Sequence, residues 1–138
     1  MKPVKPEQID ALLPFLDKFD AVGFSAGTWL TLAPGHSSWF IFDEVVKEFI
    51  QVLYDNDWVT PQFDWGEWQE SAQQYIESPE KVESADTETI QKLLTTHARA
   101  DRFCEGHLAS MFENGHILDI LRRLRKIRSQ RDQEGSDE

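Results

Sequence analysis

The densest group of chemically active side chains in the sequence lies within residues 97–107. On a helix, residues three apart are neighbours, so Arg102 and Glu105 would pair, while Arg99 and Arg102 would project from one side. This block therefore predicts either a structural ion-pair network or a functional site. Its ionisable or nucleophilic residues are His97, Arg99, Asp101, Arg102, Cys104, Glu105 and His107.

Charge pairs more often hold structure than perform chemistry, which favours a network that ties the junction of two helices. Asp64 is a candidate further partner of that network. The alternative is that Arg99 and Arg102 form a fork that binds a phosphate or carboxylate. The residues expected to bind are Arg99, Arg102, Glu105, Asp64 and Trp65.

A transition-metal site is a further alternative within the same block. His97, Asp101, Cys104 and His107 are four, three and three residues apart, which keeps successive members near one helix face. No pair among them forms a specific zinc-binding signature, and a lone buried cysteine is usually a small hydrophobic residue. We therefore expect no metal and no cofactor.

The elements that position these side chains follow from periodicity. The chain has 138 residues, of which 40% are hydrophobic, and this predicts one mostly α-helical globular domain over residues 1–129. About five helices are expected, with Pro14 kinking or dividing the first. The predicted helical segments are 6–20, 43–53, 67–76, 86–98, 101–115 and 116–129. Asp43 and Asp86 are expected to begin the second and fourth of these, the latter with Ile90, Leu93 and Leu94 on its apolar face. Ser78-Pro79 is expected to break the chain, and His116 is interpreted as a helix-start residue.

Three local features complete the predicted fold. Aromatic and β-branched residues predict a small β-hairpin over residues 28–42, with a turn at 33–36. Gly106 is anomalous inside a helix and indicates a break near residues 102–106 or a close helix contact, although Cys104 is expected to face inward. Residues 130–138 are predicted to be a disordered polar tail.

The sequence also contains an aromatic segment between residues 58 and 68. Trp58, Phe63, Trp65 and Trp68 would form an aromatic plug under the helices, because rings supply a large buried area in a small core. The alternative is an exposed patch that binds a partner.

Two resemblances bear on these residues. Leu93-Leu94-Thr95, Arg102-Phe103-Cys104-Glu105-Gly106 and Ile120-Leu121-Arg122-Arg123-Leu124, together with Phe63-Asp64-Trp65, resemble a bacterial and archaeal family classed as a domain of unknown function. That resemblance implies one compact domain and no particular activity. The spacing of Arg102 and His107 also resembles the motif of HEPN ribonucleases, which would imply metal-independent RNA cleavage by these two residues.

Charge limits the classes of partner. The formal net charge is -11, which opposes nucleic acid and anionic lipid. Six basic residues lie in the segment from Arg122 to Arg131, both included, but no aromatic residue is interleaved to stack bases. No segment predicts a signal peptide or a membrane span, and the single cysteine fits a reducing compartment, so we expect a cytoplasmic protein.

These observations favour a non-catalytic binding or adaptor protein with a protein partner. A HEPN-like ribonuclease using Arg102 and His107 is the enzymatic alternative. A third is an acidic inhibitor that mimics nucleic acid, which requires the carboxylates to line one face. The sequence predicts neither the identity of the partner nor the oligomeric state.

Overall fold

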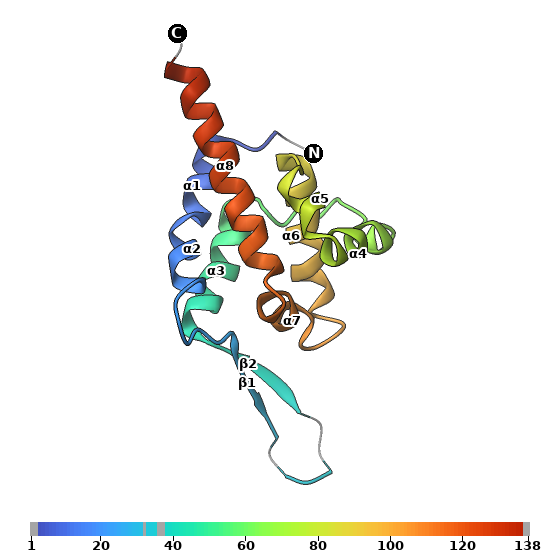
Figure 1. Cartoon of the computed structure of the whole chain (residues 1–138). Coiled ribbons are helices and arrows are strands. Elements are labelled where there is room, and N and C mark those ends of the chain that lie inside the picture. The colour runs from blue at the N-terminus through green and yellow to red at the C-terminus, as the bar shows by residue number, and fades with distance from the viewer. Residues whose placement is uncertain (1–2, 32, 36–37, 137–138) are drawn as a thin grey trace.

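Two short helices, α1 (Pro6–Leu12) and α2 (Pro14–Phe19), open the computed structural model, which describes residues 3–31, 33–35 and 38–136 (Figure 1). Proline is well suited to the first turn of a helix, because its missing N–H would have no partner there. Pro14 therefore begins a second helix, and Leu13 lies between the two. The predicted division of the first helix at Pro14 is confirmed.

A two-stranded antiparallel hairpin follows and projects from the lower end of the helical body in Figure 1. It consists of β1 (Gly27–Leu30) and β2 (Trp39–Phe42), with Trp29 opposite Phe40. The predicted hairpin is confirmed, although positions 32, 36 and 37, including His36 of the predicted turn, lie outside the described residues.

The middle of the chain forms α3 (Glu44–Asp55), α4 (Gln69–Glu77) and the short α5 (Pro79–Glu83). Asp43 occupies the position before α3 as predicted, but its side chain makes no capping hydrogen bond. The break predicted at Ser78 and Pro79 is confirmed, because α4 ends at Glu77, Ser78 is not helical, and Pro79 begins α5.

The last three helices are α6 (Thr87–Ala100), α7 (His107–Glu113) and α8 (His116–Ser136). Asp86 caps α6 as expected, since its Oδ1 accepts a hydrogen bond of 2.8 Å from the backbone N–H of Thr89. The helix predicted over 101–115 is wrong in its first part, because residues 101–106 form turns. The helix predicted to end near Ser129, before a disordered tail, continues to Ser136.

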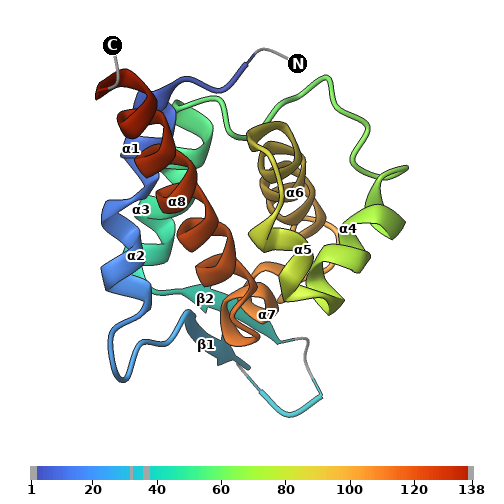
Figure 2. The ribbon, with the colours of Figure 1, turned by 45° about the horizontal axis from the view of Figure 1, so that its top comes forward.

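Helix α6 lies at the centre of the domain, and α8 packs against α1, α2, α5 and α7 (Figure 2). Almost every residue of α6 from Ile90 to Ala98 is buried. The core also contains a group of phenylalanine rings in edge and stacked contact: Phe15, Phe19, Phe24, Phe49 and Phe112. The domain is thus a single compact, mostly α-helical body.

The predicted aromatic plug is only partly present. Trp58 is completely buried, and its Nε1 donates a hydrogen bond of 2.9 Å to the Gln8 carbonyl. The other three predicted members, Phe63, Trp65 and Trp68, are only partly buried. Within the described ranges, no helix is both long and apolar enough to cross a membrane.

Candidate functional site

The connection between α6 and α7, residues 101–106, is the part of the predicted block that departs most from a helix. Asp101 closes it, because its Oδ1 accepts a hydrogen bond of 3.0 Å from the backbone N–H of Leu108 in α7. Gly106 has a φ of +89°, in the left-handed region that favours glycine. The predicted break at Gly106 is therefore confirmed, and its physical cause is a left-handed residue immediately before α7.

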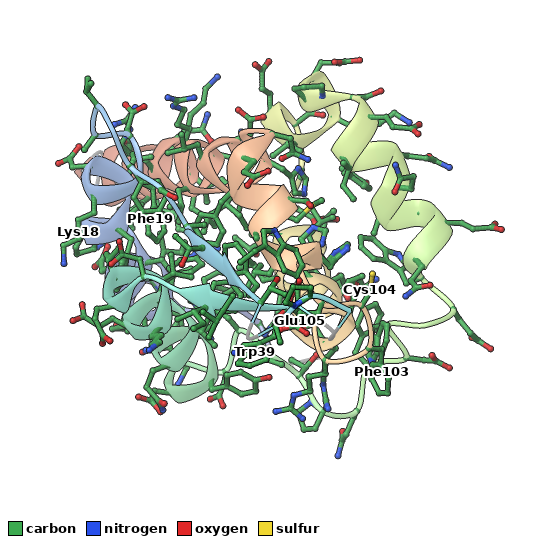
Figure 3. All side chains as sticks on the ribbon, turned by 90° about the horizontal axis from the view of Figure 1, so that it is seen from below. Lys18, Phe19, Trp39, Phe103, Cys104 and Glu105 are labelled. Carbon is green, nitrogen blue, oxygen red and sulfur yellow. The ribbon has the colours of Figure 1, made fainter. Side chains whose placement is uncertain are left out.

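This connection holds the hairpin. Oε1 of Glu105 accepts a hydrogen bond of 2.7 Å from the backbone N–H of Phe40 in β2. Gly106 lies so close to Trp29 that an added Cβ would stand 2.7 Å from Cζ2 of the indole. Figure 3 labels Glu105 where the connection passes the hairpin, and Phe103 and Cys104 on the same connection. The close contact that Gly106 predicted is thus with the hairpin rather than with a helix.

The structure does not assemble the predicted arginine–glutamate network. Arg102 is exposed and lies over the ring of Tyr54, 6.0 Å from its centroid, while Glu105 binds the hairpin. Oδ1 of Asp64 accepts a hydrogen bond from the backbone N–H of Glu67, so Asp64 stabilises the local turn that contains it. Nε of Arg99 is buried and has no hydrogen-bond partner among the described residues.

Cys104 was predicted to face inward, and this prediction is wrong. The thiol is exposed because residues 101–106 leave the helical path on which the inward spacing was counted. Among the described residues, no three His, Cys, Asp or Glu side chains are grouped as metal ligands would be. His97, Asp101 and His107, the other members of the metal alternative, have hydrogen-bond partners within the chain.

Three histidines from three helices form a continuous hydrogen-bonded chain. Nδ1 of His97 in α6 lies 3.1 Å from Nε2 of His107, the first residue of α7. Nε2 of His97 lies 3.0 Å from Nε2 of His116, the first residue of α8. His97 and His116 are buried, whereas His107 is partly exposed. Both ring nitrogens of the central imidazole are therefore occupied by the other two rings.

Burial governs the charge of these rings. It lowers the pKa of His116 to about 4 and the pKa of His97 well below its ordinary value, helped in both cases by the neighbouring histidines. Burial also lowers the pKa of His107, against the attraction of the nearby Asp101 carboxylate. All three imidazoles are thus neutral at neutral pH, and each carries one N–H.

A half-open cavity of about 290 Å³ lies between α4, α6 and the α6–α7 connection. His97 and His107 form part of its wall, and so do Phe103 and Cys104. Arg102 is not among the lining residues, although His107 is. Of the predicted site residues, the cavity therefore brings together His97, Cys104, His107 and Trp65. The remaining lining residues are Gln69, Ala72, Gln73, Ile76, Thr96 and Ala100.

The face of the hairpin opposite to Trp29 and Phe40 is apolar. In the observed register Leu30 lies opposite Trp39 and Thr28 opposite Ile41, which places these four side chains on one face. Leu30 and Ile41 have 36% and 40% of their surface exposed. We call this set, Thr28, Leu30, Trp39 and Ile41, the outer hairpin face.

The basic segment of α8 is largely engaged with the body of the domain. Arg122 pairs with Asp20 at 3.1 Å, and Arg128 pairs with Asp10 at 2.8 Å. Nε of Arg123 donates a hydrogen bond of 2.7 Å to the carbonyl of Ala85. These contacts attach the basic segment to the rest of the domain.

The sequence pattern of a family of unknown function, DUF6508, matches residues 4–130. The chain belongs to this family. No curated protein and no solved structure matches the chain. The predicted membership of a domain-of-unknown-function family is confirmed, and the matched residues contain the hairpin, the histidine chain and the cavity.

The histidine chain leaves no recognisable pattern in the sequence. His116 was interpreted only as a helix-start residue, and nothing in the spacing of 97, 107 and 116 marks a cluster. His107 and His116 are the first residues of α7 and α8, but they lie at opposite ends of α7, so their positions in the sequence do not bring the two rings together. The third member, His97, is placed by the packing of α6 alone.

Proposed function

We propose that this chain is a non-catalytic protein-binding module and that the outer hairpin face, together with the adjoining edge of β1, is its docking surface. The observation that carries the proposal is the lack of charge on an exposed apolar hairpin. Residues 21–42 include no Asp, Glu, Lys or Arg, although 28% of the chain is charged. Edge strands usually carry charges that prevent association, and this hairpin lacks them.

One strand of the hairpin is open to a further strand. The backbone N–H of Asp43 donates to the carbonyl of Ala26, so these two residues form a hydrogen-bonded pair. Hydrogen-bonded and non-hydrogen-bonded pairs alternate along an antiparallel hairpin, which makes Trp29 and Phe40 a non-hydrogen-bonded pair. The N–H and C=O of Trp29 therefore point away from β2. The corresponding edge of β2 is occupied at Phe40 by Glu105. The edge of β1 therefore fits an extended segment of a partner protein, which would add by strand pairing.

The hairpin is also held firmly enough to serve as a platform. Glu105 and Gly106 attach its inner side to the α6–α7 connection, and Trp29 and Phe40 meet edge to face at 5.4 Å. A docking surface fixed before binding loses less conformational entropy on association. The partner expected is an uncharged, extended segment rich in β-branched or aromatic residues.

A library of random linear peptides, selected on the purified chain, tests this proposal. The selected peptides should be uncharged and β-prone, and Leu30→Lys with Ile41→Lys should weaken their binding by at least about tenfold. Val22→Lys is the matched control, because Val22 is fully exposed in the same uncharged segment but lies outside the hairpin. Equal binding by the hairpin variant and the control would show that the face is not the docking surface.

Sedimentation of the purified chain separates an adaptor from a self-associating protein. We expect a monomer across the concentration range used for peptide binding. A dimer that Leu30→Lys with Ile41→Lys returns to monomer would mean that the face binds a second copy, and the adaptor role would be wrong.

A further inference from the structure

The cavity described above has walls without formal charge. No Asp, Glu, Lys or Arg is among its lining residues, although the chain has a net charge of -11. Helix α4 turns Gln69, Ala72, Gln73 and Ile76 toward it, whereas its acidic residues do not line it. The cavity therefore offers a charged ligand no side chain of opposite formal charge.

The histidine chain gives this wall a hydrogen-bonding group that can act in either direction. Three neutral imidazoles carry three N–H groups, and two of these are used in the two links between the rings. If His107 donates to His97 and His97 donates to His116, the second ring nitrogen of His107 is left as an acceptor. If His116 donates to His97 and His97 donates to His107, that nitrogen is left as a donor. That nitrogen makes no hydrogen bond within the described part of the chain.

Aromatic side chains supply a flat apolar surface on the same cavity. Trp65 and Phe103 both line it, and their rings stack with centroids 5.7 Å apart and an interplanar angle of 29°. Phe103 has 80% of its surface exposed, so its ring is accessible to a ligand in the cavity. The exposed amide of Gln69 adds donors and an acceptor, and Oε1 of Gln73 adds an acceptor, while Nε2 of Gln73 donates to Oε1 of Glu77 at 3.2 Å.

We propose that this cavity binds an uncharged, planar heteroaromatic ring of about the size of a nucleobase. Its volume of about 290 Å³ is at the small end of the range for ligand sites, which suits one ring system rather than a larger molecule. The aromatic rings would stack on the ligand, while His107 and the glutamines would satisfy its polar edge. The phosphate of a nucleotide would meet no cation and would be repelled by the acidic protein. This site is independent of the outer hairpin face, which the cavity does not include.

Titration of the ¹⁵N-labelled chain with adenine and with uracil, followed by NMR, tests the proposal. At least one of these neutral bases should shift the Trp65 indole and His107 ring signals saturably. Adenosine monophosphate and benzoate should bind at least about tenfold more weakly than that base. Gln73→Glu, which places a charge in the wall, should weaken binding of the base by about tenfold.

Gln74→Glu is the matched control, because Gln74 is the next residue of α4, is also exposed and does not line the cavity. It should leave the binding of the base unchanged. His107→Phe should also lose binding, with circular dichroism and the dispersion of the other amide signals confirming the fold. If neither base gives a saturable shift, the proposal is wrong. It is also wrong if benzoate binds as tightly as the base, or if Gln73→Glu and Gln74→Glu behave alike.

Discussion

Cζ2 of the Trp29 indole lies where a side chain on Gly106 would have to stand, only 2.7 Å from the position of an added Cβ. This contact joins two segments that are far apart in the sequence, the hairpin and the connection that leads into α7. Glycine is required there for two separate reasons, since its φ of +89° also disfavours any other residue.

Gly106→Ala should therefore loosen the hairpin as well as destabilise the domain. The left-handed φ alone should lower the free energy of unfolding by about 1–2 kcal/mol. Gly115→Ala separates the two effects, because Gly115 has a similar φ of +83° but nothing within 4 Å of its added Cβ. Urea unfolding should give losses for both variants, whereas amide exchange in residues 27–30 and 39–42 should accelerate only for Gly106→Ala. Equal hairpin exchange in the two variants would contradict the role given to Trp29.

Glu105→Ala should release the N–H of Phe40 without unfolding the protein. A hydrogen bond to a charged acceptor protects that amide, so its exchange should become faster by about tenfold or more. Glu105→Gln keeps an acceptor oxygen and should give an intermediate rate. Glu113→Ala serves as the control, since its side chain makes no hydrogen bond to the described residues, and Phe40 should then exchange as in the parent.

Two adjacent threonines of α6 should respond very differently to the same substitution. Oγ1 of Thr95 donates to the carbonyl of Trp58 at 3.0 Å and accepts from the N–H of Thr60 at 3.1 Å. Thr95→Val leaves both groups without that partner and should lower the free energy of unfolding by about 1–3 kcal/mol. Thr96 bonds only to the carbonyl of Lys92 in its own helix, so Thr96→Val should change stability by about 0.5 kcal/mol or less. Denaturant unfolding of the two variants would reveal any reversal of this order.

Acid should destabilise the protein through the histidine chain. The folded pKa values of His97, His107 and His116 lie below the ordinary value of 6.5, so the unfolded chain binds more protons than the folded one in mildly acidic solution. Stability from these groups is fully present above about pH 6.5 and is lost as the pH falls toward about 4, where His116 titrates in the folded state. Each such histidine contributes a slope of up to about 1.4 kcal/mol per pH unit. Urea unfolding across this pH range, with the His ring NMR signals followed in parallel, checks this prediction. A titration midpoint of His116 near pH 6.5 in the folded protein would refute it.

The purified chain should not cleave single-stranded RNA in the presence of a chelator. Arg102 lies over Tyr54, and the Nε2 atom of His107 faces His97, so these side chains are engaged with different parts of the protein. The net charge of -11 also opposes the approach of a polyanion. Cleavage that is lost in both Arg102→Ala and His107→Ala, with folding intact, would instead support the ribonuclease alternative.

Elements with a strong local signal could be predicted from the sequence. Asp86 and the apolar spacing of Ile90, Leu93 and Leu94 predicted α6, and Pro14 predicted the division of the first helix. The hairpin was predictable because its aromatic and β-branched residues surround a Pro-Gly turn. In each case the decisive interaction lies within a few residues of the chain.

The errors share a different physical origin. Helical spacing continued across Gly106 predicts an inward Cys104, but the backbone changes to a left-handed conformation at Gly106. Glu105 was paired with Arg102 within the block, whereas its partner is an N–H in a distant strand. The histidine chain depends on how three helices pack. Contacts of this kind leave no local pattern in the sequence, since they are set by tertiary structure.

The attachment of α8 to the first helices has a consequence for how the protein is made. Arg122 and Arg128 reach Asp20 and Asp10, and Arg131 donates to the carbonyl of Val4. On a ribosome, α1 and α2 are synthesised long before these arginines, and at usual elongation rates they wait on the order of ten seconds for them. During that interval the apolar sides of α1 and α2 lack the helix that covers them. The nascent chain can therefore bury the apolar sides of α1 and α2 completely only after α8 has left the exit tunnel.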